Sequence, residues 1–349
     1  MIKLQFIRTA DPGLSPSWDH DPKAAAALPS FQDLAGPLAP ACQSIWEWMR
    51  GNKSPEQVVA LTDDDVASLT RDLALAGPDN EVSRVSAAVQ LARHCWSGDG
   101  RLIEPLLQAL ADDTCEARMR AAMHALGLAG DAAVPALIYT LVTPRSPLVA
   151  ARAAEALGEA AATPTPTAIA ALCELAARME SDILAAAPAI DWRLPSQGGG
   201  SNFLLETFQL PLLPIEQREA AARWLTVKSC VDSLGIFGQR AVARGDGKLC
   251  LSLAQTLVEF LGSACPPVRH SAAIGLTCVA STPEVRSVAK SLLPPLLIAS
   301  QDRSAVADHN ARGPAMDALM RLLGGRRGAR GNQRAAAMLE ELVTARFTA

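Results

Sequence analysis

The segments RMRAAMHALG (118–127) and VAARAAEALG (149–158) decide the fold, because they are two copies of one apolar pattern. A third copy, SRVSAAVQLA (83–92), aligns with them without gaps, and VRHSAAIGLT (268–277) fits more loosely. The first three copies begin 35 and 31 residues apart. Self-similarity at a spacing of this kind is typical of arrays of helical repeats.

Each copy is followed by a second apolar segment of about the same length. These second segments are IEPLLQAL (103–110), VPALIYTL (134–141), IAALCELA (169–176) and LPPLLIAS (293–300). Two such helices make one supersecondary unit, which cannot bury its apolar face alone and must stack on its neighbours. The pattern therefore predicts repeats that each consist of a first helix, which carries the aligned copy, and a second helix.

Two columns of the alignment predict how the repeats pack. One column is leucine in every copy, at Leu91, Leu126, Leu157 and Leu276. The other is a pair of small residues three to five positions before this leucine, Ala87-Ala88, Ala121-Ala122, Ala153-Ala154 and Ala272-Ala273, with the second pair one position earlier than the others. Small side chains let neighbouring first helices approach closely, and we expect the leucines to fill the layer between repeats.

These residues resemble the HEAT-like repeats of the phycobilisome-lyase type, above all in RAAMHALG, AAVPALIYTL and VAARAAEALG. The resemblance covers about residues 79–180 well and about 265–323 more weakly. It implies an all-α, right-handed α-α superhelical solenoid of about six to eight helical pairs, as in armadillo-like proteins. The period is shorter than the roughly 40–47 residues of general HEAT and armadillo repeats.

The distribution of proline, glycine and charge predicts the organisation of the rest of the chain. Six prolines lie in residues 11–40, and each of them disfavours a helix at the preceding residue. We expect a Pro-rich irregular leader over 1–44 and a single solenoid over 45–349. Within the solenoid we expect clear repeats (79–180), a degenerate repeat with an inserted loop (181–247), weaker repeats (248–323), and an Arg/Gly-rich turn with a capping helix (324–349).

The composition excludes several classes of protein. Of the 349 residues, 49% are apolar and 19% are charged, so disorder of the whole chain is excluded. The net charge of -4 provides no overall attraction to nucleic acid or to an anionic membrane surface. No apolar run approaches the roughly eighteen residues of a membrane-spanning helix. The eight cysteines are scattered without a CxxC motif, which favours free thiols in a reducing compartment and a cytoplasmic location.

The sequence shows no motif for catalysis, a cofactor or a metal ion. The five histidines (His20, His94, His124, His270 and His309) form none of the His-Glu dipeptides that di-iron HEAT-type hydroxylases use. There is no nucleophile elbow, and the segment Gly245–Lys248 lacks the spacing of a phosphate-binding loop. We therefore predict no catalytic residue, no cofactor and no metal site, which leaves enzymatic activity an open question.

The polar positions of the second helices predict a binding surface. Aligning the second helices puts Gln108, Tyr139 and Glu174 in one column, with Asp112, Thr143 and Arg178 one turn later. As the resemblance implies, second helices line the concave face of such solenoids, and this is their usual binding face. Tyr139 is the one tyrosine of the chain, and tyrosine is favoured as an anchor at interfaces.

We therefore interpret the chain as a non-catalytic scaffold that binds a protein or peptide partner on its concave face. One alternative is an enzyme or chaperone similar to the phycobilin lyases, which acts on a protein-bound chromophore; it rests on the repeat resemblance alone. A second alternative is a nucleic-acid binder that uses the arginines of residues 303–349. The arginine cluster of the Arg/Gly-rich turn (324–334) stands among glycines without neighbouring aromatic residues, so the stacking platforms of single-strand binders are missing there.

Overall fold

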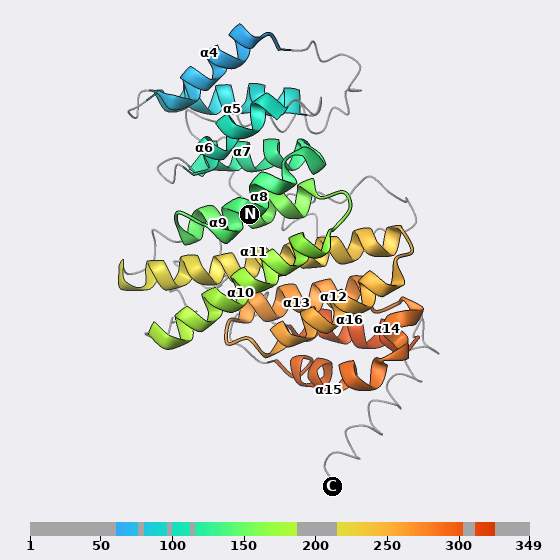
Figure 1. Ribbon diagram of the computed structural model, residues 1–349. Helices are drawn as coiled ribbons and strands as arrows, with labels where there is room; N and C mark the ends of the chain where they lie inside the picture. The colour runs from blue at the N-terminus through green and yellow to red at the C-terminus, as the bar shows by residue number, and fades with distance from the viewer. Residues whose placement is uncertain are drawn as a thin grey trace, which may run out of the picture. The chain divides into compact units, whose positions relative to one another are not determined.

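The computed structural model describes residues 61–75, 80–95, 100–111, 116–186, 215–302 and 311–324. All of them belong to one compact unit, Pro55–Ala349. Over these ranges the chain forms helices and turns without a strand, which confirms the all-α fold (Figure 1). The leader 1–44, the glycine-rich segment 197–201 expected to form the inserted loop, Asp112 and the predicted last helix lie outside the described residues.

First and second helices alternate along the chain as the repeats predict. The first helices are α5 (Glu81–Cys95), α7 (Glu116–Leu128), α9 (Pro147–Ala160), α11 (Ile215–Ala243), α13 (Pro266–Val279) and α16 (Arg312–Leu322). The second helices are α6 (Ile103–Leu110), α8 (Val134–Val142), α10 (Pro166–Ala186), α12 (Gly247–Glu259) and α15 (Ala289–Ala299). The helix α4 (Asp63–Ala74) precedes them, and the short α14 (Pro283–Ser287) lies between α13 and α15. The four aligned copies therefore lie in α5, α7, α9 and α13.

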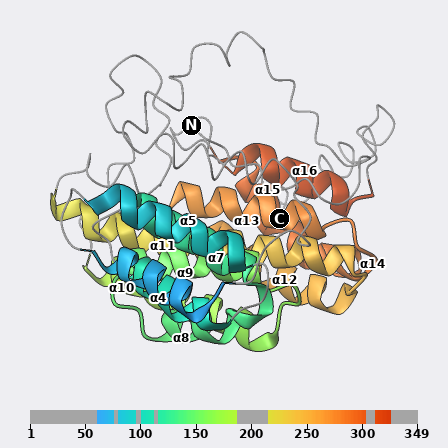
Figure 2. The same ribbon diagram turned by 90° about the horizontal axis from the view of Figure 1, so that it is seen from above.

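The first helices stack on one another in chain order. Each contacts the next, from α5 through α7, α9, α11 and α13 to α16. Each second helix packs against the first helix that follows it, as α8 does on α9 and α10 on α11. Second helices contact one another less extensively than first helices do. Figure 2 shows α4, α8 and α10 along one side of α5 and α11.

The two alignment columns form the core between repeats. Leu91, Leu126, Leu157 and Leu276 are 0 to 1% exposed. The alanine pairs of α5, α9 and α13 are likewise buried, as is Ala122 in α7. The packing predicted from the columns is confirmed at these positions, and the core is built from aliphatic side chains of two sizes.

Two glycine contacts bring neighbouring first helices closest together. A Cβ atom on Gly158 of α9 would lie 2.9 Å from the Cβ of Ser233 and 3.2 Å from its Cα. A Cβ atom on Gly235 of α11 would lie 3.2 Å from the Cα of Gly275 in α13. The backbones of α9, α11 and α13 therefore approach to distances that leave no room for a side chain.

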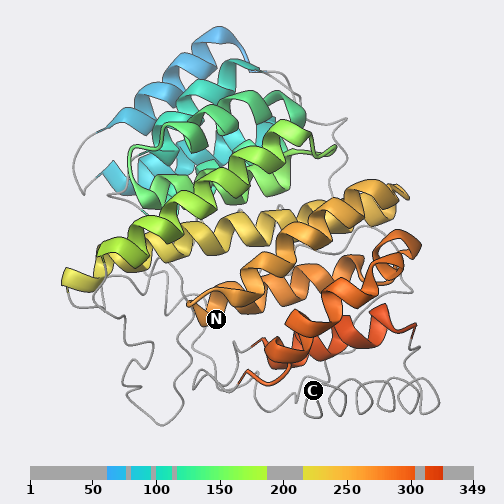
Figure 3. The ribbon, with the colours of Figure 1, turned by 60° about the horizontal axis from the view of Figure 1, so that its bottom comes forward.

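The middle of the array is carried by α11, the longest described helix. The sequence predicts a helix over about 215–235, and α11 continues to Ala243. It occupies a first-helix position, because it packs against both α9 and α13 (Figure 3). The chain between α10 and α11, residues 187–214, is the segment in which the loop was predicted, and it lies outside the described residues.

Arginines from neighbouring helices bind the free carbonyl oxygens at helix ends. Arg84 of α5 donates to the Leu75 oxygen at 2.8 Å, and Arg118 of α7 donates to the Leu73 oxygen at 3.0 Å. Both oxygens belong to the end of α4, and the last carbonyl groups of a helix have no N–H partner within the helix. A cation there also opposes the negative end of the helix dipole. The repeat alignment did not reveal this role.

The structure tests the predicted helix ends. Thr62 caps α4 and forms a reciprocal capping box with Asp65. The predicted second segment 293–300 begins too late, because α15 begins at Ala289 and contains Pro294 in its interior. Pro294 is exposed, so water can satisfy the carbonyl group that its missing N–H leaves free.

Candidate functional site

Five of the six predicted contact residues lie within the described residues, and all five are exposed. Gln108 is on α6, Tyr139 on α8 and Glu174 on α10. Thr143 follows the end of α8, and Arg178 lies one turn after Glu174 on α10. The sixth residue, Asp112, lies outside the described part of the chain.

Tyr139 projects from a short helix whose opposite side is fully buried. The tyrosine is 70% exposed, whereas Leu137 and Leu141 of the same helix are 0% and 1% exposed. Val142, three residues after Tyr139 and therefore on the same face, is 54% exposed. The helix α8 thus presents an aromatic and an aliphatic side chain together to solvent.

Local hydrogen bonds fix the end of α8 beside these two side chains. The Thr143 hydroxyl group donates to the Tyr139 carbonyl oxygen at 3.0 Å, so it caps the helix. Arg178 of α10 donates to the Leu141 carbonyl oxygen at 3.4 Å. This bond brings the α10 member of the column to the end of α8. Gln108 instead binds within its own helix, to Glu104 at 3.2 Å.

Other exposed apolar side chains occur in both layers. On second helices, Leu184 of α10 is 65% exposed and Ile298 of α15 is 59% exposed. On first helices, Ile215 at the start of α11, Ile274 of α13 and Met316 of α16 are 77%, 45% and 37% exposed. The column alignment missed Val142 and Leu184. Val142 could have been found from its spacing, because a residue three positions after Tyr139 lies on the same helix face as the tyrosine.

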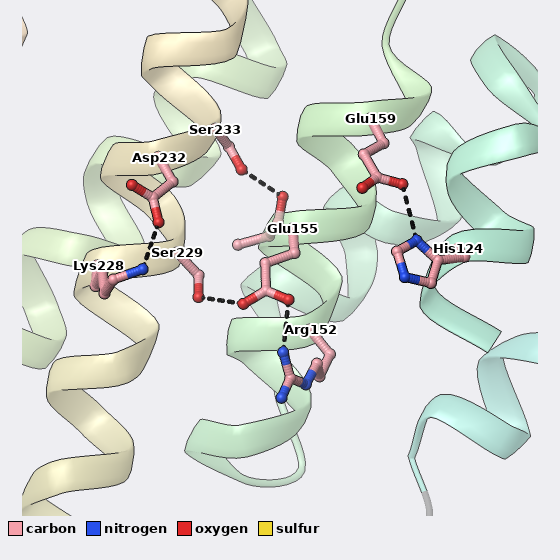
Figure 4. A network of polar contacts seen from close by, with 9 residues as sticks. His124, Arg152, Glu155, Glu159, Lys228, Ser229, Asp232 and Ser233 are labelled. Atoms are coloured by element: carbon pink, nitrogen blue, oxygen red, sulfur yellow. Dashed lines mark hydrogen bonds and ion pairs between the residues drawn. The ribbon is translucent and has the colours of Figure 1, made fainter. Parts of the chain in front are cut away.

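The first-helix layer also carries a polar network (Figure 4). Glu155 of α9 pairs with Arg152 at 2.6 Å and accepts a hydrogen bond from Ser229 of α11 at 2.9 Å. Burial raises the pKa of Glu155, but the charges of Arg152 and Lys228 and the Ser229 hydrogen bond outweigh it, so the pKa lies below its ordinary value. Glu155 is therefore held as an anion whose bonds are internal to the array.

A second contact of the same network links α7 with α9. The Nδ1 atom of His124 lies 3.4 Å from the Glu159 carboxylate. The sequence leaves His124 as an ordinary helix residue, and the structure gives it this carboxylate as a neighbour. Within the described ranges, no group of three His, Cys, Asp or Glu side chains is arranged to hold a metal ion.

The described thiols are poorly suited to nucleophilic chemistry. Burial, with smaller contributions from Glu259 and Glu174, raises the pKa of Cys173 to about 11. Burial also raises the pKa of the Cys230 and Cys265 thiols. A raised pKa leaves little thiolate near neutral pH, and the thiolate is the reactive form.

The turn before α12 explains the glycine-rich segment Gly245–Lys248. Gly245 has a φ of 69°, and the Asp246 side chain caps α12 by accepting from the Leu249 N–H at 3.0 Å. The Glu284 carboxylate fills the space where a side chain on Gly247 would lie. Two carboxylates therefore stand at this helix end, where a phosphate-binding loop would need room for an anion.

Comparison with known families identifies the repeats. A family model described as HEAT repeats matches residues 103–190. This segment consists of HEAT repeats. The match covers α6 to α10, which includes Tyr139 and Arg178. It is a match to HEAT repeats in general, and the phycobilisome-lyase type is not confirmed. No curated protein matches the chain.

Two further findings bear on the predicted partners. None of the described helices is both long and apolar enough to cross a membrane. Of the arginines in residues 303–349, Arg312 and Arg321 are described, and both are exposed on α16. The arginines of the glycine-rich turn lie outside the described residues.

Proposed function

We propose that this HEAT-repeat chain is a non-catalytic scaffold that binds a protein or peptide partner on the face formed by its second helices. The observation that carries the proposal is the 70% exposure of Tyr139, beside the 54% exposed Val142. An exposed aromatic and aliphatic pair on a rigid helix is typical of an interface anchor. In the proposal this face is the concave one, as in other HEAT arrays.

The polar members of the column have a different role in the proposal. Gln108, Glu174 and Arg178 surround the anchor as rim contacts that select and orient the partner. A charge at the rim acts mainly on the rate of association and is screened by salt. Arg178 is already oriented by its bond to the Leu141 carbonyl oxygen, so its position does not depend on a partner.

The cytoplasm is the location that the proposal assigns. Support comes from the thiols of Cys230, Cys250 and Cys265, which are buried and free. Free buried thiols are typical of proteins in reducing compartments.

Affinity purification with quantitative mass spectrometry tests the proposed face. Proteins captured by the wild-type chain are compared with those captured by Tyr139→Ala and by Ile274→Ala, which removes an exposed apolar side chain from the first helix α13, outside the proposed face. We expect the affinity for the partner to fall at least about tenfold with Tyr139→Ala, as at a central anchor. The Ile274→Ala chain should retain the partner. Circular dichroism should show unchanged helicity for both variants, because both residues are exposed.

Equal capture of every partner by Tyr139→Ala and wild type would reject this face. A partner lost with Tyr139→Ala is then measured with Arg178→Ala at two salt concentrations. The effect of this second variant should be smaller and should decrease with salt. An effect that is independent of salt would contradict the assigned rim role.

A further inference from the structure

The side of α11 that faces α9 is a row of buried hydroxyl groups. Thr226, Ser229 and Ser233 recur at helical spacing and are 0%, 0% and 1% exposed. In α9 the corresponding surface is built largely from alanine, as the repeat pattern predicts. Hydroxyl groups in such a contact are costly unless each finds a hydrogen-bond partner.

Each hydroxyl group finds its partner on α9. Thr226 donates to the Pro147 carbonyl oxygen at 2.6 Å, Ser229 to the Glu155 carboxylate at 2.9 Å, and Ser233 to the Ala154 carbonyl oxygen at 2.8 Å. The first of these lies at the beginning of α9 and the others in its middle.

Two arginines continue the row past the end of α9. Arg240 donates to the carbonyl oxygens of Glu159, at 2.7 Å, and of Ala161. Arg244 donates to the Ala162 carbonyl oxygen at 2.7 Å. The row therefore follows the whole length of α9. A shift of α11 by one residue along α9, about 1.5 Å, would lengthen the three hydroxyl bonds beyond hydrogen-bond range, because the short side chains of Thr226, Ser229 and Ser233 each reach one acceptor on α9.

The position of this row in the chain gives it a role. Residues 187–214 make the connection from α10 to α11 much longer in sequence than residues 143–146, which join α8 to α9. A longer connection allows more relative positions of the two helices that it joins, at an entropic cost of closure that rises only slowly with length. Matched hydrogen bonds are a way to select one register from several apolar alternatives.

We propose that this row of α11 side chains is a register lock, which joins the repeats before and after residues 187–214 into one cooperative unit. The lock specifies that α9, α11 and α13 open together, although the regular spacing of repeats is broken between them. Contact between α9 and α11 is the most extensive between any two helices of the described chain, in keeping with this role.

Native-state hydrogen exchange of the full chain, resolved by peptide, tests the lock. In the wild type, the most protected amides of α9 and α13 should exchange through one common opening. In the double variant Ser229→Ala/Ser233→Ala, two buried hydrogen bonds are lost. Relative to the wild type, exchange of the α11 and α13 amides should then be accelerated by a factor at least about tenfold larger than that of the α9 amides. Thr226→Val supplies an isosteric second variant that should act in the same direction.

Thr256→Val is the matched control. Its hydroxyl group bonds within α12, to the Ser252 carbonyl oxygen at 3.2 Å, and makes no bond between repeats. Its loss should leave α9 and α13 coupled. The lock is rejected if α9 and α13 already open separately in the wild type, or if the double variant accelerates both helices by the same factor.

Discussion

Replacing Gly158 with alanine tests the close approach of α9 and α11. The added Cβ would lie 2.5 Å from the Ser233 Oγ atom, 2.9 Å from its Cβ and 3.2 Å from its Cα. Rotation of the Ser233 side chain moves only the first of these atoms. The other two are fixed to the backbone of α11, so the two helices must separate.

The magnitude follows from two opposing terms. Alanine in place of glycine favours a helix by about 1 kcal/mol. Overpacking at a tight contact costs about 1–3 kcal/mol, and displacement of Ser233 also endangers its hydrogen bond to Ala154, worth about 1 kcal/mol. The contact terms dominate, so Gly158→Ala should lower the free energy of unfolding by about 1–3 kcal/mol.

Gly262→Ala is the matched control and should have the opposite sign. Gly262 ends the short helical turn Phe260–Gly262 after α12, is exposed, and a Cβ there would meet no atom within 4 Å. Because the added Cβ mainly reduces the freedom of the unfolded chain, this variant should gain about 0.4–1 kcal/mol. Urea denaturation followed by circular dichroism measures both. A shift in the same direction for the two variants would refute the assigned contact.

Two further variants test the core and the polar network. Leu126→Ala removes a side chain that is 0% exposed and should cost about 2–5 kcal/mol in urea denaturation; an unchanged midpoint would show that the repeat register is wrong. Glu155→Gln should destabilise the chain near neutral pH, because the pKa of Glu155 is lowered in the folded state and its contribution is fully present above the ordinary value of 4.5. This difference from the wild type should shrink as the pH falls through the folded-state pKa, and a difference independent of pH would contradict the assigned charge.

The sequence predicts the first-helix layer well because its packing leaves a direct trace in residue size. Column leucines and paired alanines fill the contacts between repeats in α5, α7, α9 and α13, so the pattern marks these helices. Helix caps leave a trace of the same kind, as Thr62 and Asp65 show. These features depend on residues that are close in the chain.

Contacts between distant residues could not be predicted in this way. In α11 the alanine pair is replaced by Cys230 and Val231, so the column pattern alone does not identify it as a first helix. Its place depends on hydroxyl groups whose acceptors lie 74 to 79 residues earlier in the chain. The capping of α4 by Arg84 and Arg118 depends on the stacking itself.

The candidate site lies between these two cases. The alignment places Tyr139 at a polar break in an apolar helix, and such a break indicates a side that is turned away from the core. It does not distinguish a binding residue from an ordinary solvated one. The alignment does not identify Val142 at all, because a valine does not interrupt an apolar run.

The two layers place different demands on substitutions, and this separates folding from binding. First helices use their small residues and the hydroxyl row of α11 to stack, so changes at Gly158 or Ser233 act on stability. The outer side of α8 takes no part in that stacking, since Leu137 and Leu141 face the core while Tyr139 and Val142 face solvent. A sequence can therefore vary at Tyr139 and Val142 without disturbing the array. Loss of a partner with Tyr139→Ala at unchanged stability would then report on recognition alone, which a change in the first-helix layer could never do.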